Sequence, residues 1–589
     1  MIDNLVDAML VSGRGSPMTD PTGLSRNLPH YGDAAFSIFL RKAFIKALGY
    51  TDDALERPII GIVNTFSGYN ACHQNIPDLI EAVSRGVMLN GGIPVPFPII
   101  SIHETFSHPT SMYLRNLMAM DAEEMIRAQP MDAVVLIGGC DKTVPALLMG
   151  AISANVPAIM LVTGPMLAGS WRGERLGACT DCRRFWAKYR SGEVGDEDIA
   201  AINNELAPTV GTCGVMGTAS TMALATEAMG MMLPGAAAVP AVNAERRRIA
   251  ERTGARAIAM ATEKLTPDKI VTPRSITNAL RVVLACGGST NALIHLTAIA
   301  GRAGIKVDLD GFDRLGRETP VLVDLKPTGQ GYMEDLHRAG GLPTILREMK
   351  SALHLDCLTV TGRTLGSEIA DAPPSFVQDV VKPWSQPIYS DGAMVVLRGN
   401  LAPRGAIIKQ CAADPALLQH IGPALVFDGL ADLSARIDDP NLDVTPETVL
   451  VLRNAGPKGA PGMPEAGYLP IPQKLARSGV KDMVRVSDAR MSGTAFGSIV
   501  LHITPEAAEG GPLRLVRTGD LVQLDTASRR IDLLVDEQEL AARAAAAPSA
   551  AVNKALRGYH RLYMTEVLQA DGGCDFSSFV PEPVASAPC

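Results

Sequence analysis

Ala133-Val134-Val135-Leu136-Ile137, followed directly by Gly138-Gly139-Cys140-Asp141-Lys142-Thr143, is the most informative part of the chain for its fold. A short apolar, β-rich run ends in a glycine turn, and a helix-like segment follows at 145–154. Glycine allows the backbone to approach a ligand closely, and the N-terminus of a following helix favours anions. The stretch therefore predicts a buried strand, a ligand-binding turn and a helix in succession.

The same alternation extends from about residue 58 to 343. Apolar runs at 59–63 and 158–162 lie between helix-like stretches such as 76–89. Short buried strands that alternate with helices indicate a parallel α/β domain. Ligands bind such sheets at the carboxyl ends of the strands. Cys72 and Cys140 fall in those loops.

A proline-rich segment at 372–387 is the best candidate for a domain boundary. Beyond it, runs at 394–397, 449–452 and 483–486 predict strands, and 520–524 with 530–535 predict a hairpin. The sequence thus predicts a mixed α/β protein in three parts. These are a lead-in segment at 1–30, an N-terminal α/β domain at 31–380 and a β-barrel-like C-terminal domain with a tail at 381–589.

Composition excludes several classes of partner. The 589 residues include 47% hydrophobic, 20% charged and 4% aromatic residues, and the net charge is -8. A chain of this charge has no basic face for nucleic acid or an anionic membrane. The most apolar stretch, 222–242, contains Glu227 and Pro234, so we expect a buried helix and turn rather than a membrane span. Ten scattered cysteines and no signal peptide indicate a reducing cytoplasm.

Three cysteines lie alone in turns with no CxxC partner: Cys72, Cys140 and Cys213. Three thiolates suit a metal cluster that keeps one coordination position free, and an open position makes the metal a Lewis acid. Taken alone, Cys140 fits a buried structural cysteine equally well. Cys179-Thr180-Asp181-Cys182 is the one CxxC of the chain; a zinc ribbon needs a second pair, so we interpret its cysteines as ordinary thiols.

Acidic and hydroxyl side chains accompany these thiols. Asp141 follows Cys140, and Glu104 and Glu465 lie in other turn-rich segments, where each can complete an octahedral Mg²⁺ site. Considered one at a time, Glu104 and Glu465 are better explained as solvated acids on the protein surface. Ser492 precedes a glycine after a predicted strand, a context that also suits a turn whose hydroxyl bonds its own backbone.

Four longer motifs together resemble the dihydroxy-acid and phosphogluconate dehydratase family: 138–143, 216–221, 287–291 and 488–494. The resemblance covers about 58–576. Within the family, 127–132, 395–403 and 454–462 are similar to the sugar-acid (aldonate) dehydratases, such as those acting on L-arabinonate and D-xylonate. The resemblance implies a [2Fe-2S] cluster with Mg²⁺, an α/β domain before a β-barrel domain, and a homodimer or homotetramer.

The resemblance also implies roles for individual residues. Ser492 matches the proposed catalytic base, and Lys142 matches a catalytic lysine that is N-carboxylated and then also binds Mg²⁺. Thr143 and Thr494 are expected to contact the substrate. The implied metal ligands are Cys72, Cys140 and Cys213 for the cluster, and Glu104, Asp141, Lys142 and Glu465 for Mg²⁺. His73 and the pair Gly214-Val215, which flank cluster ligands, depart from the usual family residues and put the substrate preference in doubt.

The implied reaction makes the chain a hydro-lyase. It removes water from 2,3-dihydroxy acids such as L-arabinonate, D-xylonate or D-gluconate to give 2-keto-3-deoxy acids. One alternative is the dihydroxy-acid dehydratase of branched-chain amino-acid synthesis, alone or as a second activity. Another is an iron–sulfur sensor, which requires a fourth ligand such as His73 or Cys179. The last is a zinc protein without iron.

Overall fold

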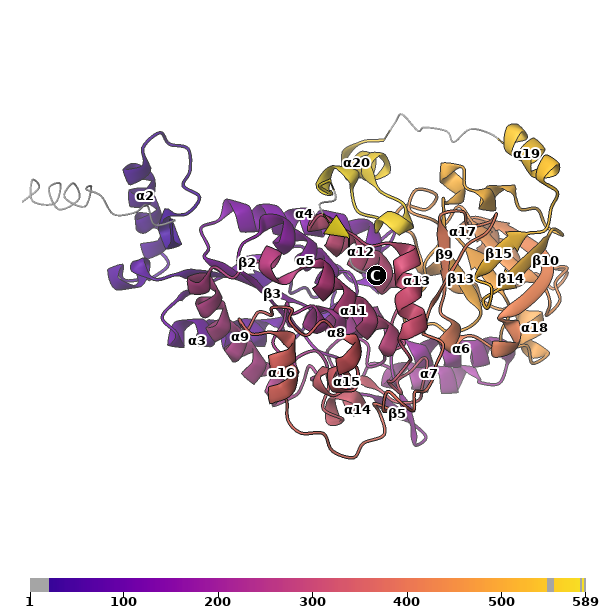
Figure 1. Ribbon diagram of the computed structural model, residues 1–589, viewed down its shortest axis with the longest axis horizontal. Helices are drawn as coiled ribbons and strands as arrows, with labels where there is room; N and C mark the ends of the chain where they lie inside the picture. Colours follow the sequence, from indigo (N-terminus) through magenta and orange to yellow (C-terminus); the bar gives the residue numbers. More distant parts are fainter. Residues whose placement is uncertain (1–20, 548–555, 583–584, 587–589) are drawn as a thin grey trace, which may run out of the picture.

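The computed structural model describes residues 21–547, 556–582 and 585–586. An N-terminal half built on a parallel sheet lies beside a C-terminal half built on a larger, curved sheet (Figure 1). Most of the expected lead-in, residues 1–20, lies outside the described part. Among the described residues, no helix is both long and apolar enough to span a membrane.

The N-terminal sheet has four parallel strands in the order β2-β1-β3-β4. The predicted strands at 59–63, 133–137 and 158–162 are confirmed. Strand β3 is buried throughout and lies between β1 and β4, which are also largely apolar. The bounds are β1 Ile59–Asn64, β2 Ile93–Pro98, β3 Ala133–Gly138 and β4 Ala158–Val162.

Helices pack around this sheet and against one another. Helix α3 has the predicted bounds, whereas α5 begins at Thr143, two residues before the predicted start. Pro145 stands in the first turn of α5, where a missing N–H costs nothing, so the proline does not mark the helix start. The region 222–242 forms a buried helix and turn as expected, because every residue of α8 is buried. The larger helices are α2 Ala34–Lys46, α3 Ile76–Leu89, α4 Ser111–Ala128, α5 Thr143–Ala154, α6 Thr180–Ser191, α7 Asp196–Glu205, α8 Thr218–Ala228, α9 Ala244–Glu263, α11 Pro273–Ala285, α12 Asn291–Arg302 and α13 Leu309–Glu318. The shorter ones are α10 Pro267–Ile270, α14 Met333–Arg338, α15 Leu342–Glu348 and α16 Leu365–Asp371.

The C-terminal sheet has eight strands in the order β15-β14-β10-β11-β12-β13-β9-β8. Strands β10 to β13 are mutually parallel, and the strands at both ends pair antiparallel. Hydrogen bonds of Arg398, just after β8, with Arg529 and Ile531 at β15 bring the two ends together. The predicted barrel-like fold is therefore confirmed. Its strands are β8 Val395–Leu397, β9 Gly405–Ile408, β10 Gln419–Asp428, β11 Val449–Arg453, β12 Arg485–Ser487, β13 Ile499–Thr504, β14 Leu521–Asp525 and β15 Arg530–Leu533.

Valine, leucine and isoleucine side chains from all eight strands fill the barrel. The helices α17 Leu430–Arg436 and α18 Gln473–Arg477 follow β10 and β11 and adjoin a second apolar cluster outside the barrel. The chain then returns to the N-terminal half: α20 Gly558–Glu566 and the residues after it pack on α4 and α12 (Figure 1). Helix α19, Glu537–Ala546, follows the β14–β15 hairpin.

Candidate active site

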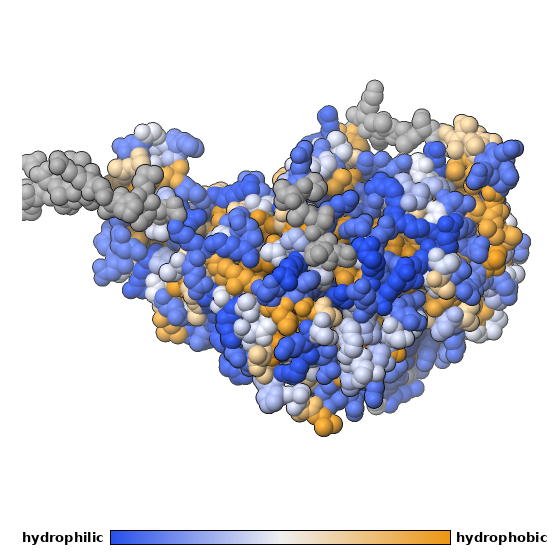
Figure 2. Space-filling model, in the orientation of Figure 1, coloured by the Kyte–Doolittle hydropathy of each residue, from blue (hydrophilic) through white to orange (hydrophobic). Residues whose placement is uncertain are grey.

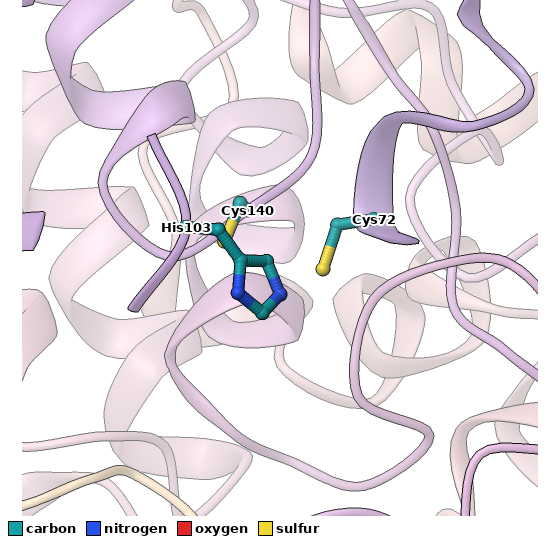
Figure 3. Close-up of side chains that lie close together, drawn as sticks. All are labelled: Cys72, His103 and Cys140. Atoms are coloured by element: carbon teal, nitrogen blue, oxygen red, sulfur yellow. The ribbon is translucent and has the colours of Figure 1, made fainter. Parts of the chain in front are cut away.

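Three loops bring the predicted cluster cysteines together. Cys72 lies in a 3₁₀ turn after β1, Cys140 follows β3, and Cys213 lies before α8. The Gly211 N–H donates a hydrogen bond to Ala71 O at 3.2 Å and so joins the first and third loops. Cys72 and Cys140 are buried. Their sulfurs and a ring nitrogen of His103 lie within 4.8 Å of one another, and the three side chains converge (Figure 3).

A fourth thiol joins this group, which the sequence indicated only as a possible fourth ligand of an iron–sulfur sensor. Cys179 is the N-cap residue of α6, and its Sγ lies 3.7 Å from the Sγ of Cys213. Hydrogen bonds from the thiols of Cys182 and Cys213 hold the pKa of Cys179 well below its usual value. Contact with Cys179 and burial raise the pKa of Cys213. The sulfur of Cys179 is therefore the preferred anion of this pair.

His73 supports the cluster loops from behind. Its Nδ1–H donates to Thr65 O at 2.8 Å, and its Nε2 accepts from the backbone N–H groups of Gly139 and Cys140 at 3.1 and 3.2 Å. Burial lowers the pKa of His73 to about 4, which keeps the ring neutral. Both ring nitrogens are engaged by backbone, so His73 does not fit the role of a fourth cluster ligand.

Lys142 lies at the centre of the predicted magnesium ligands. Its Nζ is 3.0 Å from Glu104 Oε2, 3.5 Å from Asp141 Oδ2 and 3.4 Å from Glu465 Oε1. Burial and Arg490 act to lower the pKa of the buried lysine, but the three carboxylates outweigh them and raise it. Burial raises the pKa of Asp141 to about 6. Burial acts the same way on Glu104, but Arg490 and Lys142 prevail and lower its pKa.

Arg490 is a site residue to which the sequence assigned no role. Its side chain is fully buried and bridges two carboxylates: Nη2 lies 3.0 Å from Glu104 Oε1, and Nη1 contacts Glu465 Oε1. The Asn291 Nδ2 donates to the same Glu465 oxygen at 3.4 Å. Arg490 belongs to the 488–494 motif and Asn291 to the 287–291 motif, so membership of these motifs was the available signal.

The loop that carries Ser492 packs against the N-terminus of α8. Ser492 Oγ lies 2.9 Å from Thr494 Oγ1, and both residues are buried. A Cβ on Gly493 would lie 2.5 Å from Ser289 Cβ, and one on Gly217 would lie 2.9 Å from Thr494 Cγ2. An added Cβ would clash at both glycines, which shows that these segments lie in direct contact. The motifs 216–221, 287–291 and 488–494 therefore meet at one place.

Several buried polar atoms at this place have no hydrogen-bond partner within the described part of the chain. They include Thr143 Oγ1, Asn291 Oδ1 and Arg490 Nε. Buried polar atoms are normally hydrogen-bonded, so unpaired ones at a common site indicate space for a polar ligand. Sulfur donors suit iron, and clustered carboxylate oxygens suit Mg²⁺. The residues present therefore fit an iron–sulfur cluster and a magnesium ion.

Comparison with known proteins assigns the family. Residues 57–368 match the dihydroxy-acid/6-phosphogluconate dehydratase N-terminal domain, and residues 379–574 match the C-terminal domain of the same family. A 6-deoxy-6-sulfo-D-gluconate dehydratase of Pseudomonas putida is 46% identical, over 90% of this chain and 93% of the relative. An L-arabinonate dehydratase of Rhizobium leguminosarum bv. trifolii is 45% identical, over 93% and 95%.

A dihydroxy-acid dehydratase of Carboxydothermus hydrogenoformans is 39% identical, over 86% of this chain and 92% of the relative. The two domain matches together span most of the chain, in the order in which the two halves follow one another. The chain therefore belongs to the dihydroxy-acid/6-phosphogluconate dehydratase family and is a hydro-lyase.

Proposed function

We propose that this chain dehydrates aldonic sugar acids to 2-keto-3-deoxy acids. The observation that carries the proposal is that a cluster of thiols at Cys140 lies beside a cluster of carboxylates around Lys142, the second residue after it. The proposed ligands are Cys72, Cys140 and Cys213 for a [2Fe-2S] cluster, and Glu104, Asp141, Glu465 and N-carboxylated Lys142 for Mg²⁺.

When bound, the cluster and Mg²⁺ supply Lewis acidity at the leaving hydroxyl and at the substrate carboxylate. Ser492 Oγ, deprotonated near the metal site, is the base that takes the proton from C2, and Thr494 Oγ1 orients that oxygen through their hydrogen bond. The same proton then passes to the leaving C3 hydroxyl, which departs as water. The resulting enol tautomerises to the 2-keto acid, so the products are one 2-keto-3-deoxy acid and one water.

The relatives support a sugar acid over a branched-chain acid. Those named for L-arabinonate and 6-deoxy-6-sulfo-D-gluconate are 45% and 46% identical to this chain, whereas the dihydroxy-acid dehydratase of Carboxydothermus hydrogenoformans is 39% identical. The unpaired polar atoms of Thr143, Asn291 and Arg490 belong to motifs of the whole family, so they indicate a polar ligand without distinguishing the two substrates.

The test is a dehydratase assay on anaerobically purified protein with Mg²⁺. L-arabinonate, D-xylonate, D-gluconate and 2,3-dihydroxyisovalerate are offered side by side, and the 2-keto acid is detected. We expect turnover of at least one aldonate and a loss of more than about 100-fold in Ser492→Ala. Turnover of the branched acid alone would move the chain to amino-acid synthesis. An intact iron–sulfur spectrum without any turnover would favour a sensor, and a zinc-only preparation would overturn the cluster.

The N-carboxylated Lys142 has its own test. Protein exchanged into ¹³C-bicarbonate with Mg²⁺ should show a carbamate carbon resonance by NMR that is absent in Lys142→Met. Its presence in the variant, or its absence in the active wild type, would remove Lys142 from the proposed magnesium ligands.

We also propose that the chain forms a homodimer or homotetramer through the arm that carries α2. This arm projects from the N-terminal half (Figure 1) and shows apolar surface (Figure 2). The side chains of Phe39 and Phe44 are 67% and 72% exposed. Exposed apolar side chains that gather on one surface mark protein–protein interaction sites. Light scattering should report a larger mass for the wild type than for the Phe39→Glu, Phe44→Glu double variant. Equal monomer masses would contradict the proposal.

A reducing cytoplasm is the proposed compartment. The nine cysteines of the described part of the chain are all free thiols, including those proposed to bind the cluster. Thiol quantification on protein isolated directly from cells under acid quench checks this point.

A further inference from the structure

Four cysteines at the site form two pairs, and a fifth, Cys182, lies beside one of them. The sulfurs of Cys72 and Cys140 lie within 4.8 Å of each other, and those of Cys179 and Cys213 are 3.7 Å apart. Two thiolates on one tetrahedral metal, with metal–sulfur bonds of about 2.3 Å, lie about 3.8 Å apart. The second pair already has the spacing of two ligands on one iron.

A [2Fe-2S] cluster ligated by four cysteines places two of them on each iron. Building on the proposed function, we infer that Cys179 is a displaceable fourth ligand, which occupies the free iron position next to Cys213 until the substrate arrives. In this resting form each pair of thiolates holds one iron. The substrate hydroxyl then takes the position that Cys179 leaves.

The surroundings of Cys179 suit a ligand that binds and departs. As N-cap residue of the twelve-residue helix α6, its sulfur lies where the helix dipole favours an anion. Cys182, one helical turn further on, is hydrogen-bonded to it through the thiol. On displacement one iron–sulfur bond breaks and one iron–oxygen bond forms, with no electron transferred. The freed thiolate keeps its hydrogen bond from Cys182.

The segment of Cys179 also contacts the loop that carries the proposed base. Thr180 Oγ1 donates to the backbone carbonyl of Thr494 at 3.0 Å. Movement of Cys179 away from the iron is thus linked through one residue to the loop that carries Ser492. The exchange of ligands couples cluster opening to the position of the base.

Mössbauer spectroscopy of ⁵⁷Fe-labelled protein tests the inference without relying on activity. In the resting wild type we expect both irons to have the low isomer shift of four sulfur ligands. Adding an aldonate should raise the shift of one iron. In Cys179→Ala and Cys179→Ser one iron should have the raised shift before any aldonate is added. Cys357→Ser, the control, replaces a buried thiol outside the site and should resemble the wild type.

A second readout is the decay of the visible absorption in air. Loss of the fourth ligand should shorten the half-life of this absorption several-fold in Cys179→Ala, and the half-life should be unchanged in the Cys357→Ser control. Identical Mössbauer spectra of the wild type and Cys179→Ala, with normal iron content and dehydratase activity, would overturn the inference and leave the proposed function standing. Wild type without a cluster or without turnover would instead overturn the proposed function.

Discussion

A single neutral imidazole holds the turn that carries Cys140, which makes His73 a positioning residue for the site. In His73→Ala the N–H groups of Gly139 and Cys140 lose their buried acceptor, at a cost of about 1–3 kcal/mol each. We expect less iron and acid-labile sulfide per chain and a lower Tm. His73→Gln, which retains an acceptor, should recover part of the iron. Full iron content in the alanine variant would show that the turn holds its shape unaided.

Glu227 predicts a pH dependence of stability. Burial raises the pKa of its carboxyl from 4.5 to about 7, although the N–H groups of Gly235 and Ala237 bond to it. A folded-state pKa above the unfolded value gives a contribution that is complete below about pH 4.5 and is lost as the pH rises to about 7. The Tm of the wild type minus that of Glu227→Gln should therefore fall over this range. A difference that stays constant or rises with pH would contradict the assignment.

At the residue scale, the sequence predicts ligands better than it predicts their supports. Glu104 and Glu465 lie near Lys142 as the family resemblance implied, and their roles remain predictions. Arg490 was missed, and Cys179 was considered only as the fourth ligand of an iron–sulfur sensor. Arg490 lies 386 residues from Glu104, so its contact with that acid depends on distant segments meeting in space, which no local pattern records. Cys179 and Cys213 are 34 residues apart and lie in different loops.

Helices α3 and α9 pack closely through one glycine each. A Cβ on Gly86 would lie 2.0 Å from Glu251 O, and one on Gly254 would lie 2.2 Å from Val83 O. Either alanine substitution should push the helices apart, cost about 1–3 kcal/mol and lower the Tm. Iron content should fall as well, because α3 begins four residues after Cys72.

The matched control is Gly301→Ala in α12. The added Cβ there would lie 3.6 Å from Val580 Cγ1, an ordinary contact, and alanine has the higher helix propensity. Its Tm should equal or exceed that of the wild type. Equal Tm values for Gly86→Ala, Gly254→Ala and the control would show that the helix pair adjusts without strain.

At the scale of elements, short apolar runs predicted several strands. Runs bounded by turns gave β1, β3, β4 and β11, and a polar turn gave the β14–β15 hairpin. The start of α5 was misplaced because a proline in a first helical turn looks like a boundary. The parallel order of β10 to β13 was not predicted, since strand partners depend on tertiary contacts rather than local pattern.

At the scale of the whole molecule, a buried ion pair holds the C-terminal tail against the N-terminal half. Arg302 of α12 contacts Asp575 through Nε at 2.6 Å and Nη2 at 3.0 Å, and both side chains are fully buried. Removing one partner of a buried pair costs about 3–5 kcal/mol when the other charge is left alone, and less here because Arg302 also contacts Glu123 Oε2 at 3.1 Å. Asp575→Ala should therefore lower the Tm clearly, as measured by calorimetry.

The control is Asp371→Ala. Asp371 pairs with Arg363 on the surface, where an ion pair contributes about 0–1 kcal/mol, so its Tm should change little. If both variants melted like the wild type, the packing of the tail on the N-terminal half would not depend on the buried pair.

The proposed cluster thiols and Cys179 all lie between residues 72 and 213, whereas Glu465, Arg490 and Ser492 lie in the barrel half. During synthesis, the ribosome therefore adds all of these cysteines more than 200 residues before it adds Ser492, the proposed base. All proposed cluster ligands are therefore present in the growing chain before the proposed Mg²⁺ ligand Glu465 and the proposed base have been added.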